Sequence, residues 1–187
     1  MKKTILFETT LLLIILLAYG CSNTRTDPDL DMNMKQPNIE NAVLGNQKGD
    51  LAPDFEVDII DGTKFKLSEH KGKKPVIVYF WATWCPFCKR DFNIIKNVYP
   101  KYKDSIEFVA IDLDSSEDAN AINEYVNENM LTDIKFALAD TSVLKDYSVK
   151  RTTEKYAISR DGIILWIGGG VIDENTWEIV FKGLKES

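Results

Sequence analysis

Histidine and positive charge are scarce in this chain of 187 residues. The single histidine, His70, lies in a polar segment without a neighbouring ligand motif, so we expect a surface side chain rather than a metal ligand. Acidic residues outnumber basic ones by 29 to 23, which gives a formal net charge of -6 at pH 7. This balance argues against nucleic acid as a partner and against electrostatic binding to anionic lipid.

Internal repeats and glycine-rich phosphate loops are missing as well. The run Gly168-Gly169-Gly170 follows a predicted strand, but it lacks the spacing of a dinucleotide-binding loop. We therefore expect a turn there. The length of the chain fits one ordinary domain with appendages rather than two large domains.

The longest apolar run lies near the N-terminus, at residues 11–19. Lys2 and Lys3 precede it, and its length suits the core of a signal peptide but is too short for a membrane span. Gly20, Cys21 and a polar stretch follow, which resembles a bacterial lipoprotein signal with the cysteine as the lipidated N-terminus. We therefore predict a signal peptide at 1–20 and a lipid anchor on Cys21, with an uncleaved anchor or an ordinary signal peptide as alternatives. Each version places the domain outside the cytoplasm, where cysteines can be oxidised.

Residues 21–50 are predicted to form a flexible polar tether, because they are rich in Asn, Asp and Thr and show no apolar periodicity. The folded domain is predicted at 51–187. The expected strands lie at 55–60, 64–67, 76–81, 106–113, 136–139, 155–159 and 163–167, and the expected helices at 86–98, 117–130, 143–147 and 173–185. This order predicts an α/β domain with a central mixed β-sheet, helices on both faces and an added N-terminal β-hairpin.

The segment Trp84-Cys85-Pro86-Phe87-Cys88 carries the chemistry. The apolar run before it predicts a buried strand, and the residues after it predict a helix. A C-x-x-C pair at a helix N-terminus is typical of a dithiol redox site, because backbone N–H groups and the helix dipole favour a thiolate at Cys85. Cys88, one turn later, is within reach to form a disulfide with it. A purely structural disulfide is the alternative.

Three segments resemble the thioredoxin fold, and specifically the extracytoplasmic TlpA/ResA-type thiol-disulfide oxidoreductases. They are Ala52-Pro53-Asp54-Phe55 with the hairpin after it, residues 78–88, and residues 147–149 with 156–162. The resemblance implies an enzyme of the cell envelope that exchanges disulfides with extracytoplasmic proteins. It favours a reductase, which reduces disulfides in those proteins, over an oxidase. It also implies a monomer held at the membrane by its lipid anchor and supplied by a membrane electron donor. The redox-active disulfide Cys85–Cys88 would be its only redox group, without cofactor or metal.

The resemblance also assigns roles to individual residues. Cys85 would be the more exposed nucleophile, and Cys88 the buried thiol that resolves the mixed disulfide. Asp91 lies where many relatives carry a glutamate and would move the proton of Cys88, with a solvated helix carboxylate as the alternative. We expect the substrate to contact Trp84, Pro86, Phe87, Thr152 and Thr153. Trp81 is expected to lie in the core.

One departure from the family is Thr153, which occupies the place of a cis-proline that faces the cysteine pair. A cis bond before a non-proline residue costs about 3 kcal/mol, so this loop is either trans or strained cis. Losing the proline would expose the pair to soft metal ions, and a metallochaperone that uses the Cys85 and Cys88 thiolates is therefore the alternative function. A peroxidase fits less well, because Thr83 lies two residues before Cys85 and the peroxidase pattern needs three.

Overall fold

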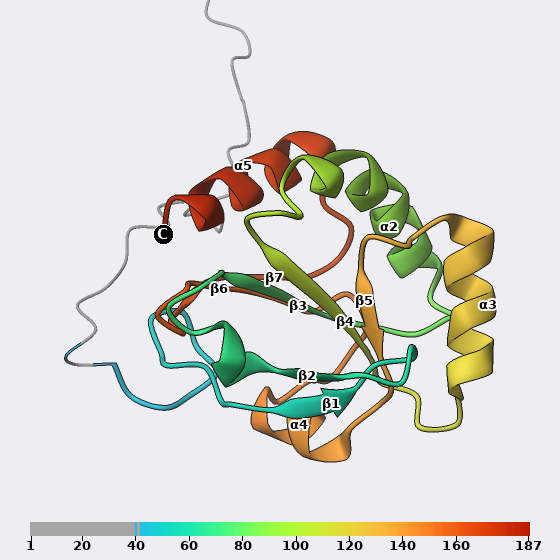
Figure 1. Cartoon of the computed structure of the whole chain (residues 1–187), viewed down its shortest axis with the longest axis horizontal. Helices are drawn as coiled ribbons and strands as arrows, with labels where there is room; N and C mark the ends of the chain where they lie inside the picture. Colours follow the sequence, from blue (N-terminus) through green and yellow to red (C-terminus); the bar gives the residue numbers. More distant parts are fainter. Residues whose placement is uncertain (1–39, 41) are drawn as a thin grey trace, which may run out of the picture. The chain divides into compact units, whose positions relative to one another are not determined.

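The computed structural model describes residue 40 and residues 42–187, so the predicted signal peptide and Cys21 lie outside the described residues. A central sheet has the strand order β5-β4-β3-β6-β7 (Figure 1). Its strands are β3 (Val76–Trp81), β4 (Glu107–Asp112), β5 (Lys135–Ala137), β6 (Lys155–Ile158) and β7 (Ile164–Gly168). The first three run parallel, β6 pairs antiparallel with β3, and β7 pairs antiparallel with β6, so the predicted mixed sheet is confirmed.

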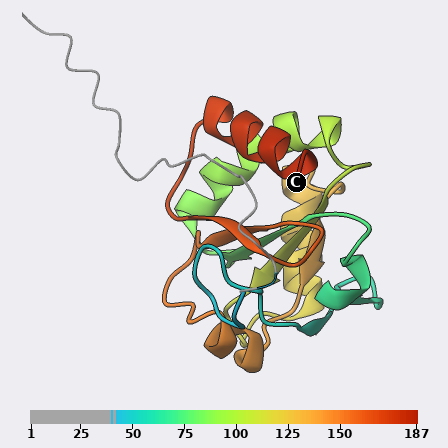
Figure 2. The same ribbon diagram turned by 90° about the vertical axis from the view of Figure 1, so that its left-hand side faces the viewer.

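Both faces of the sheet are covered, as predicted. Side chains of β3 alternate, and Ile77, Tyr79 and Trp81 enter one apolar core while the residues between them enter another. The first core packs against α2 (Pro86–Val98), α3 (Ala119–Asn129) and α5 (Glu174–Lys185). The second packs against α4 (Thr141–Asp146) and the hairpin of β1 (Glu56–Asp58) and β2 (Lys64–Lys66). Figure 2 shows α2 and α5 on the side of the sheet opposite α4.

Three of the helices begin at an aspartate. The side chains of Asp118, Asp140 and Asp173 accept backbone N–H bonds in the first turns of α3, α4 and α5. Such caps satisfy donors that have no partner within the helix and are each worth about 1 kcal/mol. Two short 3-10 segments, η2 (Leu67–His70) and η3 (Tyr99–Lys101), follow β2 and α2. No helix in the described part of the chain is long and apolar enough to cross a membrane.

Residues 42–50, which the sequence assigns to the tether, form a loop that is hydrogen-bonded to the domain. Leu51 donates its N–H to the carbonyl of Val43 at 2.8 Å. Gly49 and Asp50 exchange backbone hydrogen bonds with Ile164 at 2.8 and 2.9 Å. Because Ile164 begins β7, this loop extends the edge of the central sheet, and the folded unit begins before residue 51.

Candidate active site

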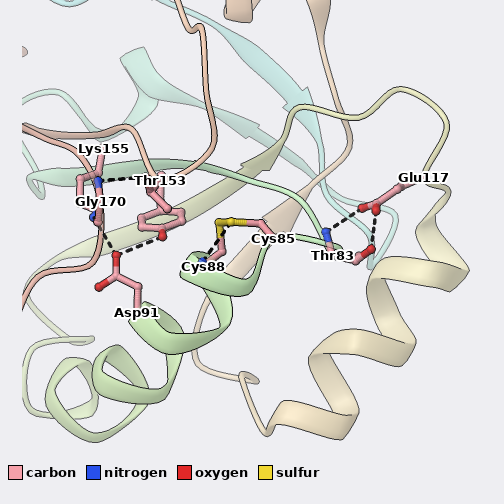
Figure 3. The surroundings of a disulfide bond; sticks show 9 residues. Thr83, Cys85, Cys88, Asp91, Glu117, Thr153, Lys155 and Gly170 are labelled. Atoms are coloured by element: carbon pink, nitrogen blue, oxygen red, sulfur yellow. Dashed lines mark hydrogen bonds and ion pairs between the residues drawn. A yellow bond between two sulfur atoms is a disulfide. The ribbon is translucent and has the colours of Figure 1, made fainter.

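The two cysteines lie at the junction of β3 and α2. Cys85 is the N-cap of α2, and its Sγ accepts a hydrogen bond from the Cys88 backbone N–H at 3.1 Å. Pro86 fits the first helical position, where its missing N–H costs no hydrogen bond. A disulfide joins Cys85 to Cys88, with their Cα atoms 5.3 Å apart (Figure 3). In the reduced state the same N–H group and the helix dipole would favour a thiolate at Cys85.

Both sulfurs of this disulfide are buried. Cys85 is 1% exposed and Cys88 is 0% exposed, so the greater exposure expected for Cys85 is absent from the oxidised protein. Trp84 and Phe87, by contrast, are 59% and 52% exposed, and Pro86 is also exposed. A buried disulfide is therefore flanked in sequence by an exposed apolar surface. The sequence pattern predicts which thiols can react, but it does not contain the tertiary contacts that bury Cys85.

Asp91 is fully buried and not a solvated helix carboxylate. Its Oδ2 accepts a hydrogen bond from the Tyr79 hydroxyl at 3.1 Å, and its Oδ1 accepts one from the Trp177 indole N–H at 2.9 Å. Lys155 completes the cluster, with Nζ 2.7 Å from Asp91 Oδ2, and both of these charged side chains are 0% exposed. The sequence singled out Asp91 but not Lys155 or Trp177. A lysine at the first position of a predicted strand that continues with Tyr156, Ala157 and Ile158 is the signal that could have found Lys155.

The ionisable partners of Asp91 respond to this burial. Burial lowers the pKa of the Lys155 ammonium below its usual range, while the negative charge of Asp91 opposes that effect. Burial and the nearby Asp91 charge both raise the pKa of Tyr79 far above its usual range, so the phenol stays protonated and acts as a donor.

The loop around Thr153 closes over the end of β3 without a proline. The described residues contain no cis peptide bond, so the peptide bond before Thr153 is trans. The backbone φ of Thr153 is 71°, which lies in the left-handed region. Thr153 donates its N–H to the Phe80 carbonyl at 2.7 Å and accepts the Gly170 N–H on its hydroxyl at 2.9 Å. Thr153 is buried and Thr152 is half-buried. The missing proline therefore leaves neither the loop nor the sulfurs open.

Acidic side chains hold the loop that precedes Cys85. Glu117 accepts hydrogen bonds from the Thr83 backbone N–H, at 3.1 Å, and from the Thr83 hydroxyl. Asp114 Oδ2 accepts the indole N–H of Trp84 at 2.8 Å. Asp112 is buried nearby, and burial, with a further contribution from the Glu117 carboxylate, raises its pKa to about 7. None of these three acids was singled out by sequence.

His70 lies outside this arrangement. Its ring is half-buried and stacks on Phe65, with ring centroids 4.6 Å apart, so it packs against the N-terminal hairpin instead of lying free on the surface. Among the described residues, no group of three or more His, Cys, Asp or Glu side chains could hold a metal ion.

Known proteins resemble this chain in sequence and in fold. The model of the AhpC/TSA family matches residues 48–167. A thiol-disulfide oxidoreductase ResA of Bacillus cereus is 34% identical over 125 residues, which cover 64% of this chain and 68% of the relative. ResA of Bacillus subtilis (strain 168) is 28% identical over 182 residues, which cover 93% and 89%. The crystal structure of thiol:disulfide interchange protein DsbE from Chlorobium tepidum has a TM-score of 0.63 at 26% identity, covering 74% of this chain and 98% of that one.

These matches agree with the geometry of the site. The family model spans most of the domain, and the name of the ResA relatives states thiol-disulfide exchange, which is the chemistry that a C-x-x-C pair supports. The fold around Cys85 and Cys88 is the thioredoxin fold that the sequence motifs predict. The chain therefore belongs to the thioredoxin-like AhpC/TSA family and is a thiol-disulfide oxidoreductase of the ResA type.

Proposed function

We propose that this enzyme is a monomer, tethered outside the cytoplasm, that reduces disulfides in other extracytoplasmic proteins. The observation that carries the proposal is the buried Cys85–Cys88 disulfide at the start of α2, flanked by exposed Trp84 and Phe87. The similarity to ResA supports the reaction class. The apolar run before Cys21 supports a lipid anchor on that cysteine after removal of residues 1–20.

The reaction consists of two thiol-disulfide exchanges. The Cys85 thiolate attacks one sulfur of a substrate disulfide, which breaks that bond, forms a Cys85–substrate disulfide and releases the first substrate thiolate. The Cys88 thiolate then attacks the Cys85 sulfur and releases the second substrate thiolate. Asp91 takes the proton of Cys88 before this second attack. Two electrons pass to the substrate, whose thiolates take up protons from water, and a membrane electron donor then reduces Cys85–Cys88 again.

Substrate proteins are proposed to dock on the exposed side chains of Trp84, Pro86 and Phe87. Exposed aromatic side chains provide a large contact area at a low entropic cost. The half-buried Thr152 is the part of the neighbouring loop that substrate reaches, and the Thr153 backbone N–H is already engaged by Phe80. Thr153 therefore contributes by fixing the loop beside the substrate.

Turnover of insulin disulfides tests the reaction. We expect Cys85→Ser to abolish it, and Cys88→Ser to accumulate a mixed disulfide with the substrate, because the first exchange proceeds and the second does not. Equal rates for wild type and Cys85→Ser would overturn the assignment.

Direction is tested by acid-trapping the redox state of the pair in the cell envelope and measuring its reduction potential. A mostly reduced pair with a potential below about -220 mV is expected of a reductase. A pair that is mostly oxidised in the cell would reverse the proposed direction.

The lipid anchor is tested separately with Cys21→Ser. The variant is expected to leave the membrane fraction and to retain its disulfide-exchange rate, since Cys21 takes no part in the chemistry. Retention of the variant in the membrane would contradict anchoring through this cysteine.

A further inference from the structure

We propose that Lys155 is a positioning residue of the dithiol site, whose buried ammonium keeps Asp91 ionised and ready to accept the proton of Cys88. The inference rests on the proposed function, in which Asp91 is the proton acceptor. Lys155 is 0% exposed, and its Nζ lies 2.7 Å from Asp91 Oδ2 and 2.6 Å from the carbonyl oxygen of Gly170. The ammonium thus has one anionic partner and one neutral acceptor in contact (Figure 3).

Strand register explains how a lysine reaches this position. Lys155 of β6 lies opposite Tyr79 of β3, so both side chains extend from the same face of the sheet toward α2 and α5. The ammonium lies 5.0 Å from the ring centroid of Tyr79 and 5.5 Å from that of Trp177. These rings stabilise a cation weakly and cannot neutralise it, so the Asp91 carboxylate is the group that balances its charge.

Helix geometry places Asp91 beside the second cysteine. Asp91 follows Cys88 by three residues in α2, and residues at this spacing are neighbours on one helix face (Figure 3). Tyr79 and Trp177 each donate to a different carboxylate oxygen, which fixes the orientation of the group. The acceptor is therefore held in a fixed orientation, three residues along α2 from the cysteine whose thiol must lose a proton.

Charge balance gives Lys155 its role. A carboxyl group buried without a cation favours its neutral form, which cannot accept a proton. With Lys155 present, the three groups begin as Cys88 thiol, Asp91 carboxylate and ammonium, with a total charge of zero. After proton transfer they are Cys88 thiolate, neutral Asp91 and ammonium, and the total is again zero. The buried site therefore gains no net charge when the resolving thiolate forms.

Lys155→Met tests the inference, because it keeps the length and apolar stem of the side chain and removes the charge. The experiment follows single-turnover release of a labelled peptide from a preformed Cys85 mixed disulfide, across a range of pH. We expect release near neutral pH to slow by about tenfold or more, within the range of general acid–base effects, and its pH profile to move upward. The attack of Cys85 on substrate, measured in Cys88→Ser and in Cys88→Ser with Lys155→Met, is expected to keep its rate. A wild-type rate and pH profile of release in Lys155→Met would overturn the inference.

The matched controls are Asp91→Asn and the double variant Asp91→Asn with Lys155→Met. The acceptor is already absent in Asp91→Asn, so adding Lys155→Met is expected to slow release no further. Independent, multiplying effects would contradict an action through Asp91. If Asp91→Asn itself releases peptide at the wild-type rate, the proton role in the proposed function fails. If only Lys155→Met does so, that role stands and the inference about Lys155 fails.

A measurement on the wild-type protein covers the case in which Lys155→Met does not fold. The carboxyl carbon of Asp91 is observed by NMR in the oxidised protein near neutral pH. An ionised carboxylate is expected, because the ammonium contacts it at 2.7 Å. A protonated Asp91 in the presence of Lys155 would overturn the inference.

Discussion

Glu117 binds Thr83 twice, accepting both its backbone N–H and its hydroxyl. Thr83 lies two residues before Cys85. Glu117 lies much later in the sequence, between the end of β4 and the start of α3. The loop that leads to Cys85 is thus held by a carboxylate from a distant part of the sequence. Hydrogen bonds to a charged acceptor are worth about 1.5–3 kcal/mol each, so this contact is a substantial constraint on the loop.

Removing this acceptor is expected to loosen the loop. Glu117→Ala should lower the free energy of unfolding by about 1–3 kcal/mol, measured in urea near pH 5, where Asp112 is protonated and does not repel Glu117. Thr83→Val is the matched control, because it removes the hydroxyl bond and keeps the N–H bond, and its effect should be smaller. A larger loss in Thr83→Val than in Glu117→Ala would contradict this ranking.

The buried carboxyl of Asp112 predicts that stability falls as pH rises. Its folded pKa of about 7 exceeds its ordinary value of 3.8, so its contribution is fully present below about pH 4 and is lost as pH rises through 7. Asp112→Asn should remove this component and raise stability near pH 8 by up to about 4 kcal/mol, since one pKa unit corresponds to about 1.4 kcal/mol. Thermal unfolding of wild type and variant between about pH 4 and pH 8 measures it. Parallel curves for the two proteins would contradict the assignment to Asp112.

Trp84 is expected to contribute to the binding of protein substrates and not to the thiol-disulfide exchange itself. Trp84→Ala should raise the KM for a protein disulfide about tenfold and leave the rate with a small soluble disulfide unchanged, because a docked aromatic ring is worth about 1–2 kcal/mol. Trp84→Phe keeps an aromatic ring but loses the hydrogen bond from the indole N–H to Asp114. Its KM for the protein disulfide should therefore lie between those of wild type and Trp84→Ala. An equal loss with both substrates would place Trp84 in the catalytic step instead.

Introducing the proline of the family at Thr153 is expected to destabilise this chain. Proline cannot adopt a φ of 71°, lacks the N–H that binds the Phe80 carbonyl, and lacks the hydroxyl that accepts from Gly170. Thr153→Pro should therefore cost about 3 kcal/mol in chemical denaturation. Thr153→Ser retains both hydrogen bonds and serves as the control. Unchanged stability in Thr153→Pro would mean that the loop adopts another conformation at no cost.

Local patterns in the sequence were sufficient for the elements that carry the cysteines. An unbroken apolar run at 76–81 predicts a strand buried on both faces, and Pro86 predicts the helix start. Asp91 was singled out by the resemblance to a family that carries a glutamate three residues after the second cysteine, and this spacing makes neighbours on one helix face. These features depend on short separations along the chain, which periodicity reports well.

The partners of Asp91 were not predictable in this way. Lys155 and Trp177 lie 64 and 86 positions away in sequence, and they reach Asp91 only through strand pairing and the packing of α5. The burial of Cys85 and the trans peptide before Thr153 likewise depend on tertiary contacts. A motif reports which groups can react, whereas their exposure and charge state follow from neighbours that a motif does not contain.

The burial of both sulfurs has a kinetic consequence for the oxidised enzyme. Thiol-disulfide exchange requires an incoming thiolate to reach a sulfur atom, and Cys85 and Cys88 are 1% and 0% exposed. Small soluble thiols that cannot displace the surrounding loop therefore collide with the protein mostly without reaction. In the proposed function, a donor that docks on Trp84 and Phe87 would have to shift that loop to reach a sulfur atom. The proposed function therefore predicts that docking, as well as reduction potential, decides which thiols reduce the oxidised enzyme.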